Sequence, residues 1–230
     1  IHDYALVGRL NMGVETEIIE ISLRALIVSG SATLLAAVFG IPIGVFLGLK
    51  RFRGRSVIKG FFNSLMGMPA VSLGLVLYLL WSRSGPLGFL HLLYTPMAMA
   101  VGQAALVTPI MVSLVTGTLE SVDPEIRDLA RTLGASETQA SIAVLRESVN
   151  GLLLAIIACF NRAIAELGVA FMVGGNIRSV TRVLTTSIAL ETTKGELALG
   201  IGLTAVLLVI AFALNAMVHF VQKRGIPLVD

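Results

Sequence analysis

Residues 125–147 have the sequence Glu125-Ile-Arg-Asp-Leu-Ala-Arg-Thr-Leu-Gly-Ala-Ser-Glu-Thr-Gln-Ala-Ser-Ile-Ala-Val-Leu-Arg-Glu147, a polar, charged stretch among long apolar segments. Just before it, Asp123 suits a helix N-cap and Pro124 the first helical position. Gly134 interrupts the helical pattern, and Ser136 with Gln139 is typical of a capping box that starts a second helix. The stretch predicts two short helices, residues 123–147, which we call the knob; an ordinary amphipathic surface loop is the alternative.

The composition is that of an integral membrane protein. Of 230 residues, 56% are hydrophobic and 13% charged, against about 25% charged residues in soluble domains. One cysteine, Cys159, excludes a disulfide within the chain. His2, His91 and His219 are scattered over different segments, which argues against a metal cluster. The first apolar run is too long for a secretory signal peptide.

Five apolar segments are long enough to cross a bilayer, which takes roughly 20 residues. They are predicted at residues 25–49, 61–81, 97–119, 150–173 and 197–221. Residues 1–17 mix charges with apolar side chains and predict a short amphipathic segment at the membrane interface. The predicted fold is therefore all-α and integral to the membrane, one domain over residues 1–230 with about five transmembrane helices.

The first span carries Gly40, Gly44 and Gly48 at intervals of four residues, on one helical face. Such a stripe lets a neighbouring helix approach closely. The alternative is flexibility of a lipid-facing surface, and we favour the packing seam. Pro42, inside the same span, predicts a kink.

The distribution of Lys and Arg predicts the orientation. The block that begins at Lys50 abuts spans on both sides, so we expect it to fix topology rather than bind nucleic acid. Ten cations fall on the knob's side: Lys50, Arg51, Arg53, Arg55, Lys59, Arg127, Arg131, Arg146, Lys223 and Arg224. Five fall on the other side: Arg9, Arg83, Arg178, Arg182 and Lys194. Positive charge favours the cytoplasm. The N-terminus is expected outside, and the C-terminus and knob inside.

Arg162 and Glu166 lie four residues apart in the fourth span, on one face of the expected helix. Charges at membrane depth usually face protein or water. They are either a structural ion pair, or Arg162 with Asn161 lines a path and offers a cation to an anionic substrate. Further candidates for a polar path, each equally able to bond between helices, are Asn63, Ser64, Ser72, Gln103 and Thr108.

The knob resembles the cytoplasmic coupling loop of ABC-importer permeases. Ala130, Gly134 and Val144 stand at the spacing of that family's pattern, Glu-Ala-Ala, three residues, Gly, nine residues, Ile-x-Leu-Pro. The sequence departs from it where Asp128-Leu129 replaces Glu-Ala and Arg146-Glu147 replaces Leu-Pro. The resemblance implies contact with an ATPase through Asp128, Leu129, Ala130, Arg131, Thr132, Leu133, Gly134, Ala135 and Ser136.

Other segments extend the resemblance over nearly the whole chain. Met66-Gly-Met-Pro69 with Gly85-Pro-Leu-Gly88 is similar to molybdate-type oxyanion permeases, and residues 160–182 with 185–196 resemble the tungstate-uptake permeases. The resemblance implies a type I importer fold and uptake of a tetrahedral oxyanion. Tungstate is expected in particular, with molybdate and sulfate as alternatives.

The family further implies a homodimer in a prokaryotic inner membrane. Its partners would be a second copy of the chain, a cytoplasmic ATPase dimer, an extracytoplasmic oxyanion-binding protein and membrane lipid. Closure of the ATPase pair would move the knobs and switch the spans from inward-open to outward-open.

Nothing in the sequence resembles a nucleotide or catalytic site. Gly200-Ile-Gly202-Leu-Thr-Ala205 matches a dinucleotide fingerprint only as a string, since it lies in a span with no preceding strand. There is no phosphate-binding Gly-x-x-x-x-Gly-Lys-Ser/Thr and no set of nucleophile and base. We expect no enzyme activity and no cofactor in this chain, with ATP and Mg bound by the partner ATPase.

The rival function is that of a secondary transporter or channel that works without an ATPase. Spans broken at Pro42, Pro69 and Pro109 would suit such a transporter. A non-transporting scaffold is a third possibility.

Overall fold

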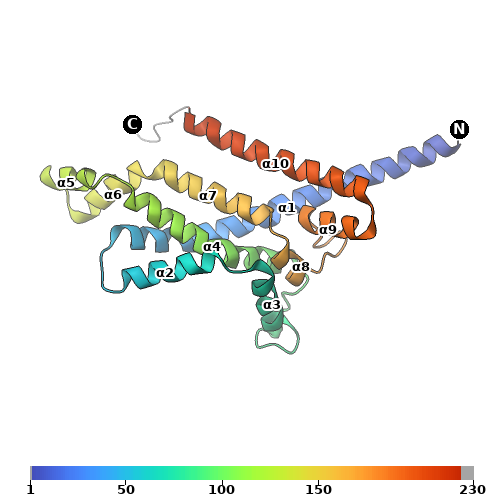
Figure 1. Cartoon of the computed structure of the whole chain (residues 1–230), viewed down its shortest axis with the longest axis horizontal. Helices are drawn as coiled ribbons and strands as arrows, with labels where there is room; N and C mark the ends of the chain where they lie inside the picture. Colours follow the sequence, from blue (N-terminus) through green and yellow to red (C-terminus); the bar gives the residue numbers. More distant parts are fainter. Residues whose placement is uncertain (1, 224–230) are drawn as a thin grey trace. The chain divides into compact units, whose positions relative to one another are not determined.

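The computed structural model describes residues 2–223, with side chains over residues 16–216, and all regular structure in this part is helical. Figure 1 follows the elements along the chain. They are α1 (His2–Leu49), α2 (Arg55–Met66), α3 (Ala70–Trp81), the 3-10 helix η1 (Gly88–Leu90), α4 (Pro96–Glu120), α5 (Pro124–Thr132), α6 (Glu137–Glu147), α7 (Val149–Ile164), α8 (Gly168–Gly174), α9 (Leu184–Lys194) and α10 (Leu197–Lys223).

Three of the described helices contain segments long and apolar enough to cross a membrane: Thr16–Leu49, Pro96–Glu120 and Leu197–Ala216. The number rises to five when each of two bent helix pairs, α2 with α3 and α6 with α7, counts as one span. The axes of α6 and α7 differ by 58°. The prediction of about five spans therefore agrees with the structure only when these bent pairs are included.

Three predicted segments have different boundaries. The span expected at 61–81 breaks between Met66 and Ala70, because Pro69 lacks a backbone donor and disfavours the helical conformation of the residue before it. The span expected at 150–173 stops at Ile164 and resumes as α8. Residues 2–17 form no separate interfacial helix but are the first part of α1.

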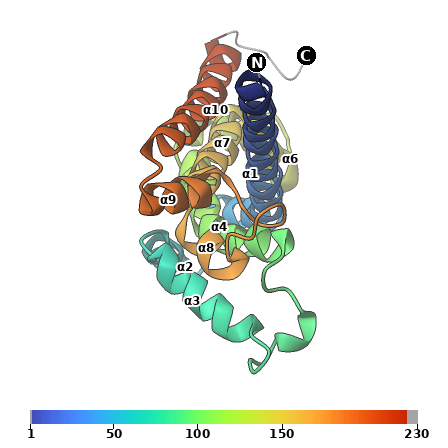
Figure 2. The same cartoon turned by 90° about the vertical axis from the view of Figure 1, so that its right-hand side faces the viewer.

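The chain packs as two compact units, each built from separate segments of the sequence. Unit 1 comprises residues 1–31, 70–103 and 164–214. Its buried core includes Met99 of α4, Val169 and Val173 of α8, and Leu184 of α9; α8 and α9 are both seen in Figure 2. Against α8 packs α3, so closely that a Cβ on Gly74 would lie 2.9 Å from Cβ of Met172.

Unit 2 comprises residues 32–69, 104–163 and 215–230. Its core joins α1, α4, α6 and α7 through residues that include Ala36, Val107, Met111, Val115, Leu119, Val144, Ala155 and Cys159. The predicted glycine seam is confirmed, because a Cβ on Gly44 would lie 2.7 Å from Cβ of Val115. A Cβ on Gly40 would come similarly close to Met111, and a Cβ on Gly48 would come similarly close to Leu119.

Candidate functional site

The knob has the two helices and the caps that the sequence predicts. At the start of α5, Asp123 Oδ1 accepts a hydrogen bond from the backbone N–H of Glu125 at 3.0 Å. At the start of α6, Ser136 and Gln139 exchange side-chain bonds to each other's backbone N–H, at 2.8 and 3.4 Å. Gly134 turns the chain between the helices with φ of +87°, a conformation that favours glycine.

The knob is anchored on one side and exposes apolar side chains on the other. Ala140 and Val144 of α6 are buried, and Val144 belongs to the core of unit 2. By contrast, Leu129 is 62% exposed and Leu133 is 79% exposed. An exposed pair of leucines on a capped, core-anchored element is suited to contact another protein.

Arg127 connects the two knob helices to each other and to α1. Its Nη2 donates to Glu137 Oε1, and its Nη1 donates to the carbonyl oxygen of Leu49 at 3.3 Å. Arg131 adds a second ion pair to Glu137, with 3.3 Å between Nε and Oε2. The hydrogen bond from Arg127 lowers the pKa of Glu137 below its usual value of 4.5. The ion pairs of Glu137 therefore persist into more acidic solution than an ordinary glutamate would allow, and they join the two knob helices.

A second group of contacts joins the helix ends behind the knob. Arg55 Nε donates to the carbonyl oxygen of Leu47 at 2.6 Å, and Nη2 donates to that of Gly48 at 3.3 Å. Arg55 also pairs with Glu120 at the end of α4, and Lys59 Nζ lies 2.6 Å from Oε2 of the same carboxylate. Glu120 was not among the predicted site residues, although a carboxylate that ends a span opposite a basic block is a signal for such a contact.

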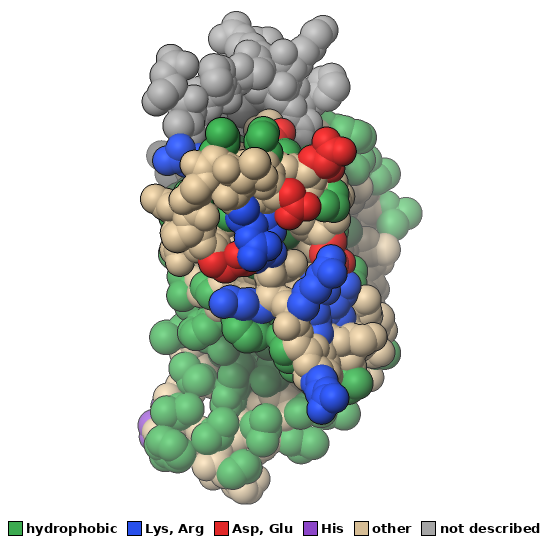
Figure 3. All heavy atoms as spheres, turned by 90° about the vertical axis from the view of Figure 1, so that its left-hand side faces the viewer, with side chains coloured by type: hydrophobic (Ala, Val, Ile, Leu, Met, Phe, Trp, Pro, Cys, Tyr) green, Lys and Arg blue, Asp and Glu red, His purple; other side chains and the backbone are tan. Residues whose placement is uncertain are grey.

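A hollow of about 760 Å³ lies between the ends of α1 and α4 and the knob. Figure 3 looks onto this end of the chain, where cationic and acidic side chains gather side by side. The charged residues of its lining are Lys50, Arg51, Arg55, Arg127, Arg131, Glu120, Asp123, Asp128 and Glu137. Five cations and four carboxylates therefore leave this lining with little net charge.

The candidate path residues divide between the two units. Ser72, on an exposed face of α3, and Gln103, buried in α4, belong to unit 1. Gln103 Oε1 accepts from Ser29 Oγ at 3.4 Å. In unit 2, Asn161 Nδ2 donates to Asn215 Oδ1 at 2.8 Å. The path role of these side chains stays a prediction.

The expectation that Arg162 and Glu166 share one helical face is wrong. Because α7 ends at Ile164, Glu166 lies in the break before α8 and not on the helix that carries Arg162. The two roles considered for these residues, an ion pair or a place in the path, stay predictions. Glu166 is 3% exposed, and its Oε1 accepts from the backbone N–H of Gly168 at 2.8 Å and of Val169 at 3.3 Å. The carboxylate thus accepts hydrogen bonds from backbone N–H groups in the first turn of α8.

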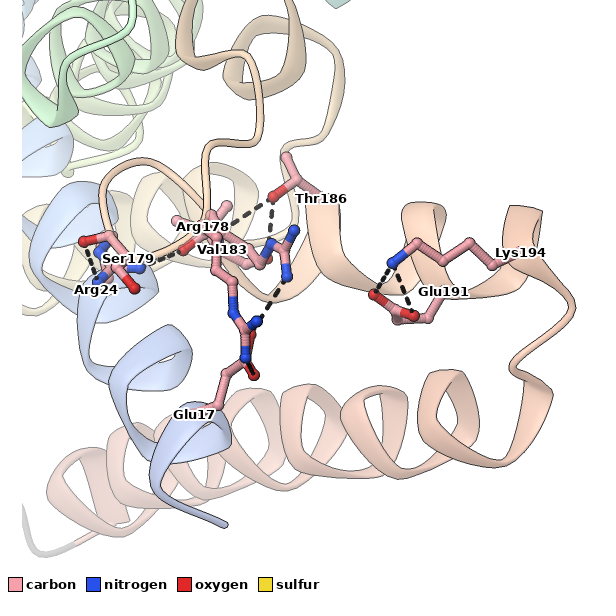
Figure 4. Close-up of polar contacts among 9 residues, drawn as sticks. Glu17, Arg24, Arg178, Ser179, Val183, Thr186, Glu191 and Lys194 are labelled. Carbon is pink, nitrogen blue, oxygen red and sulfur yellow. Dashed lines mark hydrogen bonds and ion pairs between the residues drawn. The ribbon is translucent and has the colours of Figure 1, made fainter. Parts of the chain in front are cut away.

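Another cluster, also missed from the sequence, holds the loop between α8 and α9 (Figure 4). Glu17 of α1 accepts two bonds from Arg178, at 2.7 and 3.1 Å, and one from Arg182 at 3.3 Å. Arg24 donates to the carbonyl oxygens of Arg182 and Ser179, at 3.0 Å each. These bonds link the loop to α1 within unit 1.

The family described as "Binding-protein-dependent transport system inner membrane component" matches residues 40–226. The chain belongs to this family. It is 40% identical over 210 residues to the tungstate uptake system permease protein of Peptoclostridium acidaminophilum, covering 91% of this chain and 92% of that one. It is also 40% identical over 215 residues to a probable anion ABC transporter permease protein of Haloferax volcanii, covering 91% of each.

The fold is shared with a solved methionine ABC transporter. The structures superpose with a TM-score of 0.74 at 15% identity, over 90% of this chain and 95% of the other. Together with the family, this confirms the predicted all-α, type I permease fold and a multi-pass inner-membrane protein. Such a permease is a non-catalytic membrane subunit, and a separate ATPase hydrolyses ATP, as the sequence predicted. The family implies an ATPase, a binding protein and a dimeric arrangement.

Proposed function

We propose that this chain is the permease subunit of an ATP-driven importer for a tetrahedral oxyanion, tungstate in particular. The observation that carries the mechanism is the exposed Leu133 on a knob whose other side is fixed in the core of unit 2. The caps at Asp123 and Ser136, together with the ion pairs of Glu137, hold the two knob helices together so that they can move as one body. Tungstate is supported by the name of the relative at 40% identity.

The knob docks into a cleft of the ATPase through residues 128–136. Leu129 and Leu133 fill an apolar pocket of that partner, while Ala130 and Gly134 permit a close approach. ATP and Mg are bound by the ATPase dimer and not by this chain. A second copy of the chain completes the translocation path, and Ser72, Gln103, Asn161, Arg162 and Glu166 are the candidates for its wall or its support.

The class of cargo is a compact divalent oxyanion. A sulfate permease of Salmonella typhimurium and a molybdate/tungstate permease of Methanocaldococcus jannaschii are each 28% identical to this chain. An extracytoplasmic binding protein delivers the oxyanion and provides most of the selection. Competition of molybdate and sulfate against radiolabelled tungstate, in vesicles that contain the whole importer, measures this selectivity.

The chain is oriented with its N-terminus outside and its C-terminus and knob inside, because most cations lie on the knob's side. Arg224, one of those cations, is outside the described residues. Arg178 and Glu137 both have exposed side chains, and the native Cys159 is buried. An impermeant thiol reagent added to intact cells should label Arg178→Cys, and Glu137→Cys only after lysis. The reverse pattern contradicts this orientation.

The coupling role is tested by binding-protein-stimulated ATP hydrolysis in the reconstituted complex. Leu133→Asp should lower the stimulated rate by more than about tenfold, since burying an unpaired carboxylate in an apolar pocket costs several kcal/mol. Ile142→Asp is the matched control, because Ile142 is exposed on the same knob but outside residues 128–136. Equal coupling in both variants refutes the proposal. Uptake by this chain in vesicles without any ATPase supports the secondary transporter instead.

A further inference from the structure

A cavity of about 200 Å³ lies within unit 1, between α1, the loop from α8 to α9, α9 and α10. A single water needs only about 10–15 Å³ of such space, so the cavity has room for a small polyatomic ion. None of the candidate path residues belongs to its lining. It is therefore a place for a ligand that the proposed path does not account for.

The charged side chains of this cavity leave it with one excess positive charge. They are Arg178, Arg182 and Lys194 against Glu17 and Glu191. Figure 4 shows Arg178 bound to Glu17 and, apart from them, Lys194 bound to Glu191. Each of these two pairs has two hydrogen bonds, whereas Arg182 reaches Glu17 only through Nη1, at 3.3 Å. Arg182 is thus the least neutralised of the three cations.

Two donors at this cavity have no acceptor among the described residues. Ser187, in the first turn of α9, is 1% exposed, and its hydroxyl makes no hydrogen bond. The Nε of Arg182 is also buried without a partner. Buried polar groups of native proteins are nearly always hydrogen-bonded. Because both groups belong to one lining with a net positive charge, the missing acceptor is best supplied by an anion in the cavity.

We infer that this cavity is an extracytoplasmic binding site for a tetrahedral oxyanion of the cargo class. The inference rests on the proposed function for its ligand and on the proposed orientation for its side of the membrane. One oxygen of the ion accepts from Ser187 Oγ and another from Arg182 Nε. A tetrahedral ion has oxygens in four directions, so it can accept from α9 and from the preceding loop at once. Water would leave the excess cation unbalanced, and a carboxylate has its two oxygens in one plane.

The test is equilibrium binding of radiolabelled tungstate to the complex of this chain with its ATPase, without binding protein and without ATP. The native complex should bind tungstate, and Ser187→Ala should bind it about tenfold more weakly, through loss of one hydrogen bond to a charged group. Since that hydroxyl bonds to no described residue, the variant should melt no lower than the native chain. Thr193→Ala is the matched control on α9 and should bind as the native complex does, because Thr193 Oγ1 donates to the carbonyl oxygen of Ala189 at 2.6 Å and lies outside the lining.

A second pair of variants tests the charge. Arg182→Gln should weaken tungstate binding by more than about tenfold, because it removes both the Nε donor and the excess cation. Arg83→Gln, which changes an exposed arginine outside the lining, should leave binding unchanged.

Three results would overturn the inference. Tungstate binding of native affinity in Ser187→Ala would place the ion elsewhere in the complex. No binding by the native complex would leave only water in the cavity. Competition by acetate as strong as that by sulfate would show a carboxylate site, such as one for an acidic side chain of the binding protein.

The inference and the proposed function fail separately. If the whole importer takes up tungstate with ATP but the complex without binding protein binds none, only the cavity site is wrong. If the Ser187→Ala effect on binding is found but ATP hydrolysis drives no oxyanion uptake, only the proposed function is wrong.

Discussion

Arg127 donates from Nη1 to the carbonyl oxygen of Leu49, 3.3 Å away, and so ties the knob to the last residue of α1. The last four carbonyls of a helix lack intrahelical donors, and a cation is stabilising at this end of the helix dipole. Because Arg127 also pairs with Glu137, one side chain joins α1, α5 and α6. A displacement of the knob therefore reaches α1 through a direct contact.

Arg127→Gln should weaken the coupling of ATP hydrolysis to transport much more than it lowers the stability of the fold. The variant keeps an amide NH2 group but is shorter and uncharged, so it cannot bond to Leu49 and Glu137 at once, and the knob and α1 move independently. We expect several-fold less oxyanion transported for each ATP hydrolysed, with a loss in unfolding free energy of about 1 kcal/mol, since Arg127 is part-exposed. Arg146→Gln should match the native ratio. An unchanged ratio in Arg127→Gln would mean that this contact carries no motion.

The stability that Glu137 provides should depend on pH with a definite sign. Since its pKa is lowered in the folded chain by Arg127, its contribution is fully present above the unfolded value of about 4.5 and disappears as the pH falls through the lower folded value. The melting temperature of the native chain should therefore exceed that of Glu137→Gln at neutral pH. The two should converge on acidification below pH 4.5, as followed by loss of helical circular dichroism. A gap that persists or widens in acid contradicts the assignment.

Close packing of α1 on α4 makes Gly44 intolerant of even one methyl group. A Cβ there would lie 2.7 Å from Cβ of Val115 and 3.0 Å from the carbonyl oxygen of Val112. Gly44→Ala should cost about 1–3 kcal/mol, because the helices must separate. Gly117→Ala is the matched control, since Gly117 lies in α4 with open space around it, and it should be neutral or stabilising by up to about 1 kcal/mol. Thermal denaturation in detergent compares the two; equal melting temperatures would refute the seam.

The parts of the fold that depend on local chemistry were predictable from the sequence. The knob's helices begin where Asp123 and Ser136 cap them, because capping involves residues only two or three positions apart. The glycine seam was predictable for a similar reason, since its stripe is visible in one helix. Contacts such as Arg55 with Glu120 join positions 65 residues apart, and no local pattern specifies them.

The break before α8 was not predictable from hydropathy, because the residues on both sides of it are apolar. Glu166 was expected on one helix with Arg162, but it lies in the break, where its carboxylate accepts from backbone donors that the break leaves without helical partners. The close approach of the chain here also requires glycine: a Cβ on Gly168 would lie 2.9 Å from the backbone N of Val71. The sequence shows that Glu166 lies in an apolar run, but it does not show which hydrogen-bond donors the carboxylate accepts from.

If Glu166 acts by capping the first turn of α8, its variants should behave differently from those of a residue that lines the translocation path. Glu166→Ala leaves the buried N–H of Val169 and that of Gly168 without an acceptor, which should cost about 1–3 kcal/mol in unfolding free energy. Glu166→Gln keeps an acceptor oxygen in the same place and should recover the part of that loss that comes from these two hydrogen bonds, although it removes the charge. Thermal denaturation and oxyanion uptake of the two variants in the whole importer measure the difference. If Glu166→Gln is as stable as the native chain yet abolishes uptake, the negative charge acts on the cargo or its path, and capping is not the main function of this side chain.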